Sequence, residues 1–127
     1  MTSALEPFQW KVTREQISAY AEASGDRNPI HLDEEAARAA GLPGVIAHGM
    51  LGMAQLANFV VAYAGDHRRI RRLRCRFSGM VLPGDTITFT GRVAGEEGGL
   101  TTLELSAENQ KGERVLTKAL AEVATAG

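Results

Sequence analysis

An acidic and a basic side chain stand five residues apart in a segment rich in turn-forming residues. Asp26 and His31 lie in the sequence Gly-Asp-Arg-Asn-Pro-Ile-His, which begins at Gly25. A loop of this kind allows both side chains to reach one point, where a carboxylate and an imidazole can orient a water molecule and transfer its protons. Asn28 and Pro29 are residue types that hold such a loop in one shape. The spacing predicts general acid–base chemistry, although the same string in isolation is also typical of an ordinary turn.

A second candidate site lies where a helix is expected to begin. The segment from Gly49 to Ala64 is almost entirely apolar, so we expect a helix that is buried on most of its sides. Unpaired N–H groups and the positive end of the helix dipole gather at a helix N-terminus, and glycine permits close approach by a ligand. Gly49 is therefore a candidate for stabilising negative charge on a carbonyl oxygen. His48 is expected either to line this site or to orient the start of the helix.

Metal and thiol chemistry are weaker alternatives. Asp26, His31 and His48 offer ligand atoms, but their spacing does not match a regular metal-binding motif, and we expect no metal. Cys75 is the single cysteine, which excludes an intrachain disulfide and a cysteine-based metal site. We expect Cys75 to be an inert core residue.

The other elements must position these residues. Apolar spacing, caps and turn residues predict a short leading strand and two helices before the apolar helix, over residues 8–12, 13–24 and 33–40. Apolar and polar residues then alternate in four segments, at 70–77, 86–90, 103–107 and 115–123, separated by turns at 83–85, 95–99 and 109–112. This order predicts an α+β fold, in which an antiparallel sheet covers the apolar helix. We expect residues 1–127 to form one domain.

Composition narrows the choice of partners and compartment. The formal net charge is −1, so no overall attraction to nucleic acid or to anionic lipid is expected. The longest apolar stretch is shorter than the ~20 residues that span a bilayer, and the N-terminal residues do not have the pattern of a secretory signal. We expect a cytoplasmic protein that contacts neither membranes nor nucleic acid.

Arginines cluster in one segment of the second half. Arg72, Arg74 and Arg76 alternate with apolar residues in a predicted strand, so their side chains should share one face. This face is either a solvated surface or a docking site for phosphate groups or for an acidic partner.

The two motifs together resemble a known family. Gly-Asp-Arg-Asn-Pro-Ile-His, followed by Ile-Ala-His-Gly-Met at 46–50, is similar to the signature of the MaoC-like, (R)-specific enoyl-thioester hydratases. The similarity extends from Val12 to about Val123 and includes the Val-Leu-Pro-Gly-Asp turn at 81–85. The chain also resembles the catalytic subunit of the mycobacterial hydroxyacyl-carrier-protein dehydratases.

The resemblance implies a hot-dog fold, a curved antiparallel sheet wrapped around one long central helix. It implies reversible syn addition of water to a trans-2-enoyl thioester of coenzyme A or acyl carrier protein, giving the (R)-3-hydroxyacyl product without a cofactor. Asp26 and His31 would hold and activate the water, and the Gly49 N–H would polarise the thioester carbonyl. If the face of Arg72, Arg74 and Arg76 is a docking site, it would take the phosphates of coenzyme A or an acidic acyl carrier protein. A homodimer is expected, and a heterodimer with a second hot-dog chain is an alternative. The competing functions are a non-catalytic partner subunit and an acyl-CoA thioesterase.

Overall fold

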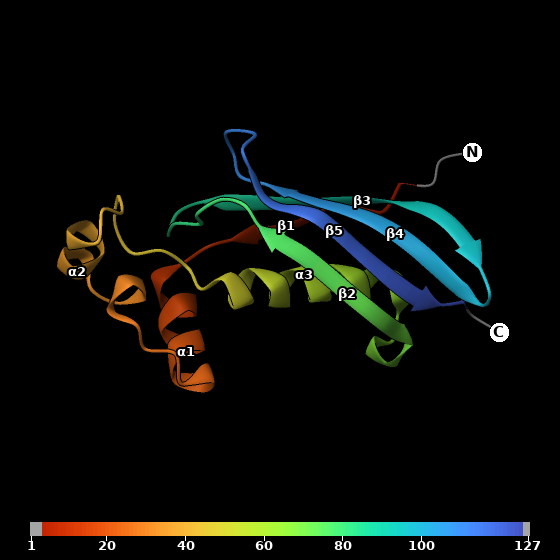
Figure 1. Cartoon of the computed structure of the whole chain (residues 1–127), viewed down its shortest axis with the longest axis horizontal. Coiled ribbons are helices and arrows are strands. Elements are labelled where there is room, and N and C mark those ends of the chain that lie inside the picture. Colours follow the sequence, from red (N-terminus) through yellow and green to blue (C-terminus); the bar gives the residue numbers. More distant parts are fainter. Residues whose placement is uncertain (1–3, 126–127) are drawn as a thin grey trace.

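A five-stranded antiparallel sheet curls around one long helix (Figure 1). The computed structural model describes residues 4–125. Its elements, in chain order, are β1 (Phe8–Lys11), α1 (Arg14–Ser24), the 3-10 helix η1 (Pro29–His31), α2 (Glu34–Ala39), α3 (Gly49–Ala64), the 3-10 helix η2 (His67–Arg69), β2 (Ile70–Phe77), β3 (Thr86–Glu97), β4 (Leu100–Glu108) and β5 (Arg114–Ala124). The strand order is β1-β3-β4-β5-β2. The predicted α+β hot-dog architecture is confirmed.

The core lies between α3 and the concave face of the sheet. Leu56, Phe59 and Val60 of α3 are buried, and they belong to the same cluster as the sheet residues Ile87 and Phe89. The rings of Phe59 and Phe89 lie 6.0 Å apart between centroids, a usual separation for packed aromatic pairs. Burial of these large side chains fixes α3 against the sheet.

Local sequence signals set the ends of the first helix. Thr13 and Gln16 form a reciprocal capping box at the start of α1, and Gly25 ends this helix with a φ of 79°. That left-handed conformation favours glycine, which has no Cβ to clash. The chain then leaves the sheet, so that α1, η1 and α2 project past the end of the sheet where α3 begins (Figure 1).

The predicted turn at 95–99 is wrong in extent. Strand β3 continues to Glu97, with backbone pairs such as Gly95 with Thr102, and only Gly98 and Gly99 form the turn. Both glycines have positive φ, as a tight two-residue hairpin requires. The end of β3 is exposed on both faces, so apolar and polar residues do not alternate there. The alternation therefore predicted a strand shorter than the one observed.

Helix α3 is less enclosed than its composition predicted. The sheet covers one side, whereas five apolar residues on another side are exposed or half-buried: Met50, Met53, Ala54, Ala57 and Val61. These positions repeat at three- and four-residue intervals and therefore form a stripe along the helix. An apolar stripe at the surface is typical of a contact with another chain. Within residues 4–125, no helix has the length and apolarity to span a bilayer.

Candidate active site

A chain of side-chain to backbone hydrogen bonds holds the loop that follows α1. Ser24 Oγ accepts from the Asp26 N–H at 3.1 Å, Asp26 Oδ1 accepts from the Asn28 N–H at 3.3 Å, and Asn28 Oδ1 accepts from the Ile30 N–H at 3.2 Å. Such local bonds favour turns over regular helix. Pro29 then begins η1. Asp26 is exposed, and its Oδ2 makes no hydrogen bond within the described part of the chain, so this oxygen is available to a ligand.

The tautomer of His31 follows from its hydrogen bond. His31 Nδ1 lies 2.7 Å from the carbonyl oxygen of Ile46. A carbonyl oxygen only accepts, so Nδ1 must carry the proton. The other ring nitrogen of neutral His31, Nε2, then has a free lone pair. This arrangement leaves Nε2 as a proton acceptor.

His48 contacts both members of the predicted pair. Its Nε2 donates to the backbone carbonyl of Asp26 at 2.9 Å, and its ring stacks on that of His31 with centroids 3.8 Å apart and planes 20° apart. Tyr20 also packs against the His48 ring in an edge-on arrangement, with the two ring centroids 4.8 Å apart. His48 is only 3% exposed, and its Nδ1 has no hydrogen-bond partner among the described residues. His48 makes no side-chain cap at the start of the helix; its ring instead holds the loop that carries Asp26 and the ring of His31.

The three polar side chains meet at one point. One ligand atom each from Asp26, His31 and His48 lie within 4.8 Å of one another. A water molecule fits this donor set better than a metal ion. Imidazole lone pairs lie in the ring plane, and the two stacked planes are nearly parallel, whereas zinc requires lone pairs that converge at ~2.0–2.1 Å. The cluster is therefore suited to acid–base chemistry on a water molecule.

The start of α3 presents free donors beside this cluster. The N–H groups of Leu51 and Gly52 share the His48 carbonyl oxygen, while the N–H groups of Gly49 and Met50 have no acceptor within residues 4–125. The side chain of His48 does not cap the helix. These free N–H groups and the helix dipole can stabilise an oxygen that gains negative charge.

Gly49 is also required by its packing. A Cβ at this position would lie 3.3 Å from Cγ of Phe77, the last residue of β2. Any larger side chain would displace the ring. Phe77 is half exposed and lines the same cavity as Gly49, a role that its position at a strand end did not indicate.

An apolar cavity of about 180 Å³ opens next to the helix start. His48, Gly49 and Gly52 form one end of it. The rest is lined by sheet residues, by Trp10 and by the connection after β2, including Phe77, Met80, Val81, Ile87, Phe89 and Val115. A linear apolar chain can enter between α3 and the sheet while a polar head stays at His48 and Gly49.

The arginines of β2 lie elsewhere. Arg72, Arg74 and Arg76 are exposed and do not line the apolar cavity. Their cross-strand partners include Glu122, Leu120 and Thr117, on the outer face of the sheet, opposite α3. Arg72 lies 4.0 Å from Glu122, at the limit of an ion pair.

Cys75 is a poor candidate nucleophile. Burial raises the pKa of the Cys75 thiol, which lowers the fraction of reactive thiolate at neutral pH. This agrees with its predicted role as a core residue.

Comparison with known proteins relates the whole site to one family. The MaoC like domain family matches residues 4–114. A fatty acid synthase beta subunit of Cochliobolus carbonum is 40% identical over 101 residues, which cover 77% of this chain and 5% of that protein. The chain thus spans about one-twentieth of this relative.

Solved structures agree. A MaoC-like dehydratase superposes with a TM-score of 0.93 at 32% identity, over 99% of this chain and 40% of that one. An R-hydratase from Pseudomonas aeruginosa superposes with a TM-score of 0.81 at 25% identity, over 100% of this chain and 83% of that one.

Proposed function

Because the chain belongs to the MaoC-like domain family, we propose that it is a hydro-lyase acting on acyl thioesters. The reaction is the reversible (R)-specific hydration of trans-2-enoyl thioesters, equivalent in reverse to dehydration of (3R)-hydroxyacyl thioesters. One observation carries the proposal. Asp26 and His31 cluster with His48, which directly precedes the free N–H groups of Gly49 and Met50 and lines an apolar cavity together with Gly49.

The polar groups divide the work of hydration. The acyl chain occupies the apolar cavity, and the thioester oxygen accepts from the Gly49 N–H, which stabilises negative charge at that oxygen during the reaction. His31 Nε2 and the free oxygen of Asp26 hold one water molecule. The water oxygen forms a bond to C3 as His31 takes its proton, and one member of the pair, Asp26 or His31, returns a proton to C2 from the same side. One hydroxyl and one hydrogen are thereby added, and no cofactor takes part.

Three further residues maintain this geometry in the proposal. Asn28 and Pro29 shape the loop that carries Asp26 and His31. His48 fixes the loop through the Asp26 carbonyl and supports the ring of His31. None of the three needs to touch the reacting atoms.

The first test is hydration of crotonyl-CoA, followed as loss of the enoyl-thioester absorbance. We expect turnover by the wild-type protein and a decrease of about 10²–10⁴-fold in Asp26→Asn and in His31→Ala, the range for loss of an acid–base group. Circular dichroism and urea unfolding should show that both variants remain folded. Near wild-type rates in either variant would contradict the assignment of the catalytic pair.

The same reaction mixture separates the competing functions. Release of free thiol from the thioester, without formation of the 3-hydroxy product, would indicate a thioesterase. If the purified homodimer turns over neither short nor medium-length enoyl thioesters, the chain is a non-catalytic partner subunit. A single unpaired cysteine and a thioester substrate both suit the reducing cytoplasm.

A further inference from the structure

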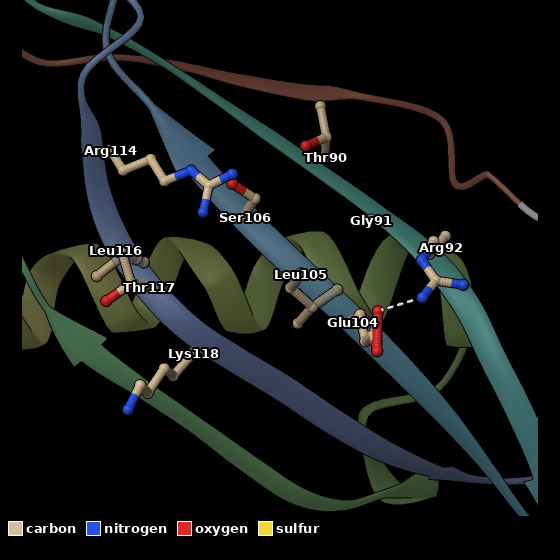
Figure 2. Close-up of a pocket in the computed structure, with 10 residues that line it drawn as sticks. All are labelled: Thr90, Gly91, Arg92, Glu104, Leu105, Ser106, Arg114, Leu116, Thr117 and Lys118. Carbon is tan, nitrogen blue, oxygen red and sulfur yellow. Dashed lines mark hydrogen bonds and ion pairs between the residues drawn. The ribbon is translucent and has the colours of Figure 1, made fainter.

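Cavities of different chemistry lie on the two faces of the sheet. Figure 2 shows the outer face, away from α3, where a hollow of about 400 Å³ lies among Arg92, Arg114 and Lys118. Arg92 forms an ion pair with Glu104 there, which a dashed line marks. Charged groups of this kind resist burial beneath an apolar chain. The apolar cavity of about 180 Å³ between α3 and the sheet is therefore the better place for the tail of an acyl group.

A glycine within α3 borders this apolar cavity. Gly52 is buried and lines the cavity, and a Cβ added at this position would meet no contact within 4 Å. The φ of Gly52 is not positive, so the backbone does not need glycine, which is less favourable than alanine inside a helix. Neither conformation nor packing accounts for glycine at this position, whereas the space beside it is part of the cavity.

The cavity crosses beneath the sheet and ends at Trp10. Its walls include Phe77 of β2, Val115 of β5, Ile87 of β3 and Trp10 of β1, and β2 and β1 are the two edge strands. Gly49 lies at the β2 end, because a Cβ there would touch Phe77, and both residues are exposed. Trp10, in contrast, is buried and pairs with the fully buried Ile87. The cavity is thus open where α3 begins and closed at β1.

The indole of Trp10 is held in place as an end wall. Its N–H donates to Oε1 of Gln16 at 2.8 Å, and Gln16 belongs to the capping box that begins α1. Because burial and this hydrogen bond both fix the indole, a substrate tail does not readily displace it. Helix α1 also leads into the loop that carries Asp26, so one element holds the closed end of the cavity and the candidate catalytic loop.

The volume of the cavity limits the length of a bound tail. An apolar cavity of ~150 Å³ holds benzene, which corresponds to ~25 Å³ for each carbon. At this packing, a cavity of about 180 Å³ holds a tail of about seven carbons. In the proposed reaction C1 to C3 lie at the polar groups of Gly49, Asp26 and His31. An acyl chain of about ten carbons therefore fills the cavity as far as Trp10.

We propose that Gly52 and Trp10 determine which acyl-chain lengths this protein accepts. Gly52 lies on the same side of α3 as Gly49, one helical turn further along. A tail bound with its carbonyl at Gly49 therefore passes Gly52 first and reaches Trp10 last. Gly52 leaves the width of the cavity free for the tail, and Trp10 ends it. The inference rests on the proposed function and adds to it a limit of about ten carbons on the acyl group.

The first test changes the width of the cavity. Gly52→Ala adds one methyl group beside the tail. The ratio of kcat/KM for trans-2-octenoyl-CoA to that for crotonyl-CoA should fall about ten-fold, as when an apolar pocket loses room for one methylene. The melting temperature should rise by about 2–5 °C, because alanine favours the helix and fills empty space. Loss of the longer substrate together with higher stability separates a specificity effect from damage to the fold.

Gly95→Ala is the matched control. Gly95 lies at the exposed end of β3, its φ is not positive, and a Cβ there would also meet no contact within 4 Å. It does not line the apolar cavity. The same added methyl group should therefore leave the ratio of the two kcat/KM values within about two-fold of wild type.

Trp10→Phe tests the closed end of the cavity. The smaller ring leaves room for further carbons. The ratio of kcat/KM for trans-2-dodecenoyl-CoA to that for trans-2-octenoyl-CoA should be low in the wild-type protein and rise about ten-fold in this variant. The two variants thus shift the preference in opposite directions, towards shorter tails at Gly52 and towards longer tails at Trp10.

Tryptophan fluorescence tests binding independently of catalysis. Trp10 is the single tryptophan of the chain, so its emission reports on the closed end of the cavity. The probe is octanoyl-CoA, which has no double bond to hydrate, and butyryl-CoA is the short control. Octanoyl-CoA should change the emission and butyryl-CoA should not. In Gly52→Ala the Kd for octanoyl-CoA should rise about ten-fold.

The outcomes distinguish this inference from the proposed function. An equal change for all chain lengths in Gly52→Ala, a wild-type preference for dodecenoyl over octenoyl thioesters, or an emission that octanoyl-CoA leaves unchanged would overturn the assignment of Gly52 and Trp10. A change in emission with octanoyl-CoA, in a protein that turns over no enoyl thioester, would support the cavity as a tail site and contradict the proposed function instead.

Discussion

The imidazole of His48 joins groups that lie far apart in the sequence. It donates a hydrogen bond to the Asp26 carbonyl, stacks on the ring of His31 and makes an edge-on ring contact with Tyr20. Any movement of this ring would therefore move both members of the proposed catalytic pair. We assign His48 as a positioning residue, which acts through Asp26 and His31.

Two substitutions separate the contributions of the His48 ring and its N–H group. His48→Phe keeps a planar ring against His31 but removes the donor to the Asp26 carbonyl. We expect kcat to fall by about two- to twelve-fold, since a hydrogen bond contributes ~0.5–1.5 kcal/mol. KM should stay within two-fold, because the apolar cavity is retained. Steady-state kinetics measures both values. An unchanged kcat in His48→Phe, with a loss in His48→Gln, would show that stacking alone orients the site.

The contact between Gly49 and Phe77 predicts a second residue-scale effect. In Gly49→Ala the new methyl group meets the Phe77 ring at 3.3 Å, so the ring must move. Because this ring lines the same cavity as Gly49, we expect kcat to fall by up to about 10²-fold, the effect of losing one oxyanion donor. Stability should change little, because the helix preference of alanine over glycine opposes the cost of moving the Phe77 ring. The double variant Gly49→Ala with Phe77→Leu should recover part of kcat. If kcat does not recover in the double variant, the loss arises from the backbone at position 49 and not from the contact with Phe77.

At the scale of the elements, the bulge in β5 holds Lys118 in a left-handed conformation, which lowers the stability of the fold. Lys118→Gly should raise the free energy of unfolding by about 0.5–1 kcal/mol, because relief of a left-handed L-residue, ~1–2 kcal/mol, exceeds the entropic cost of glycine. Lys118→Val should lower it by more than ~1 kcal/mol, since a β-branched residue is poorly accommodated at positive φ. Urea unfolding measures both. Equal stability of the two variants would mean that the bulge relaxes at no cost.

Local chemistry explains which elements were predictable. Thr13, Asp33 and Gly25 act within a few residues of their own positions, so the ends of the helices were visible in the sequence. The extent of β3 was not, because Gly95 to Glu97 are held by pairing with a strand that follows them. The same limit applies to the site. The proximity of Asp26 and His31 followed from a short loop, whereas the bond from His48 to Asp26 spans 22 residues and depends on the whole packing.

At the scale of the molecule, the surface of one chain is incomplete. Strand β2 is an edge of the sheet, with unpaired backbone groups of the kind that natural proteins usually cover. The apolar stripe of α3, defined by Met50, Met53, Ala54, Ala57 and Val61, is exposed or half-buried. Strand β2 packs against α3, so one partner chain that pairs with the β2 edge can also reach the helix that carries the stripe.

The open edge and the stripe predict a homodimer whose formation supports activity. Light scattering after size exclusion should give twice the 13.6 kDa mass of one chain. Ala57→Glu with Val61→Glu places two charges in the stripe and should give a monomer, because a desolvated, unpaired carboxylate is costly in an apolar interface. Gln9→Glu, on exposed β1 at the other edge of the sheet, is the control and should remain dimeric.

The stripe begins at Met50, directly after Gly49, so the monomeric variant should also lose kcat/KM although Asp26, His31 and His48 are intact. A wild-type monomer, or a fully active monomeric variant, would mean that one chain encloses the substrate unaided.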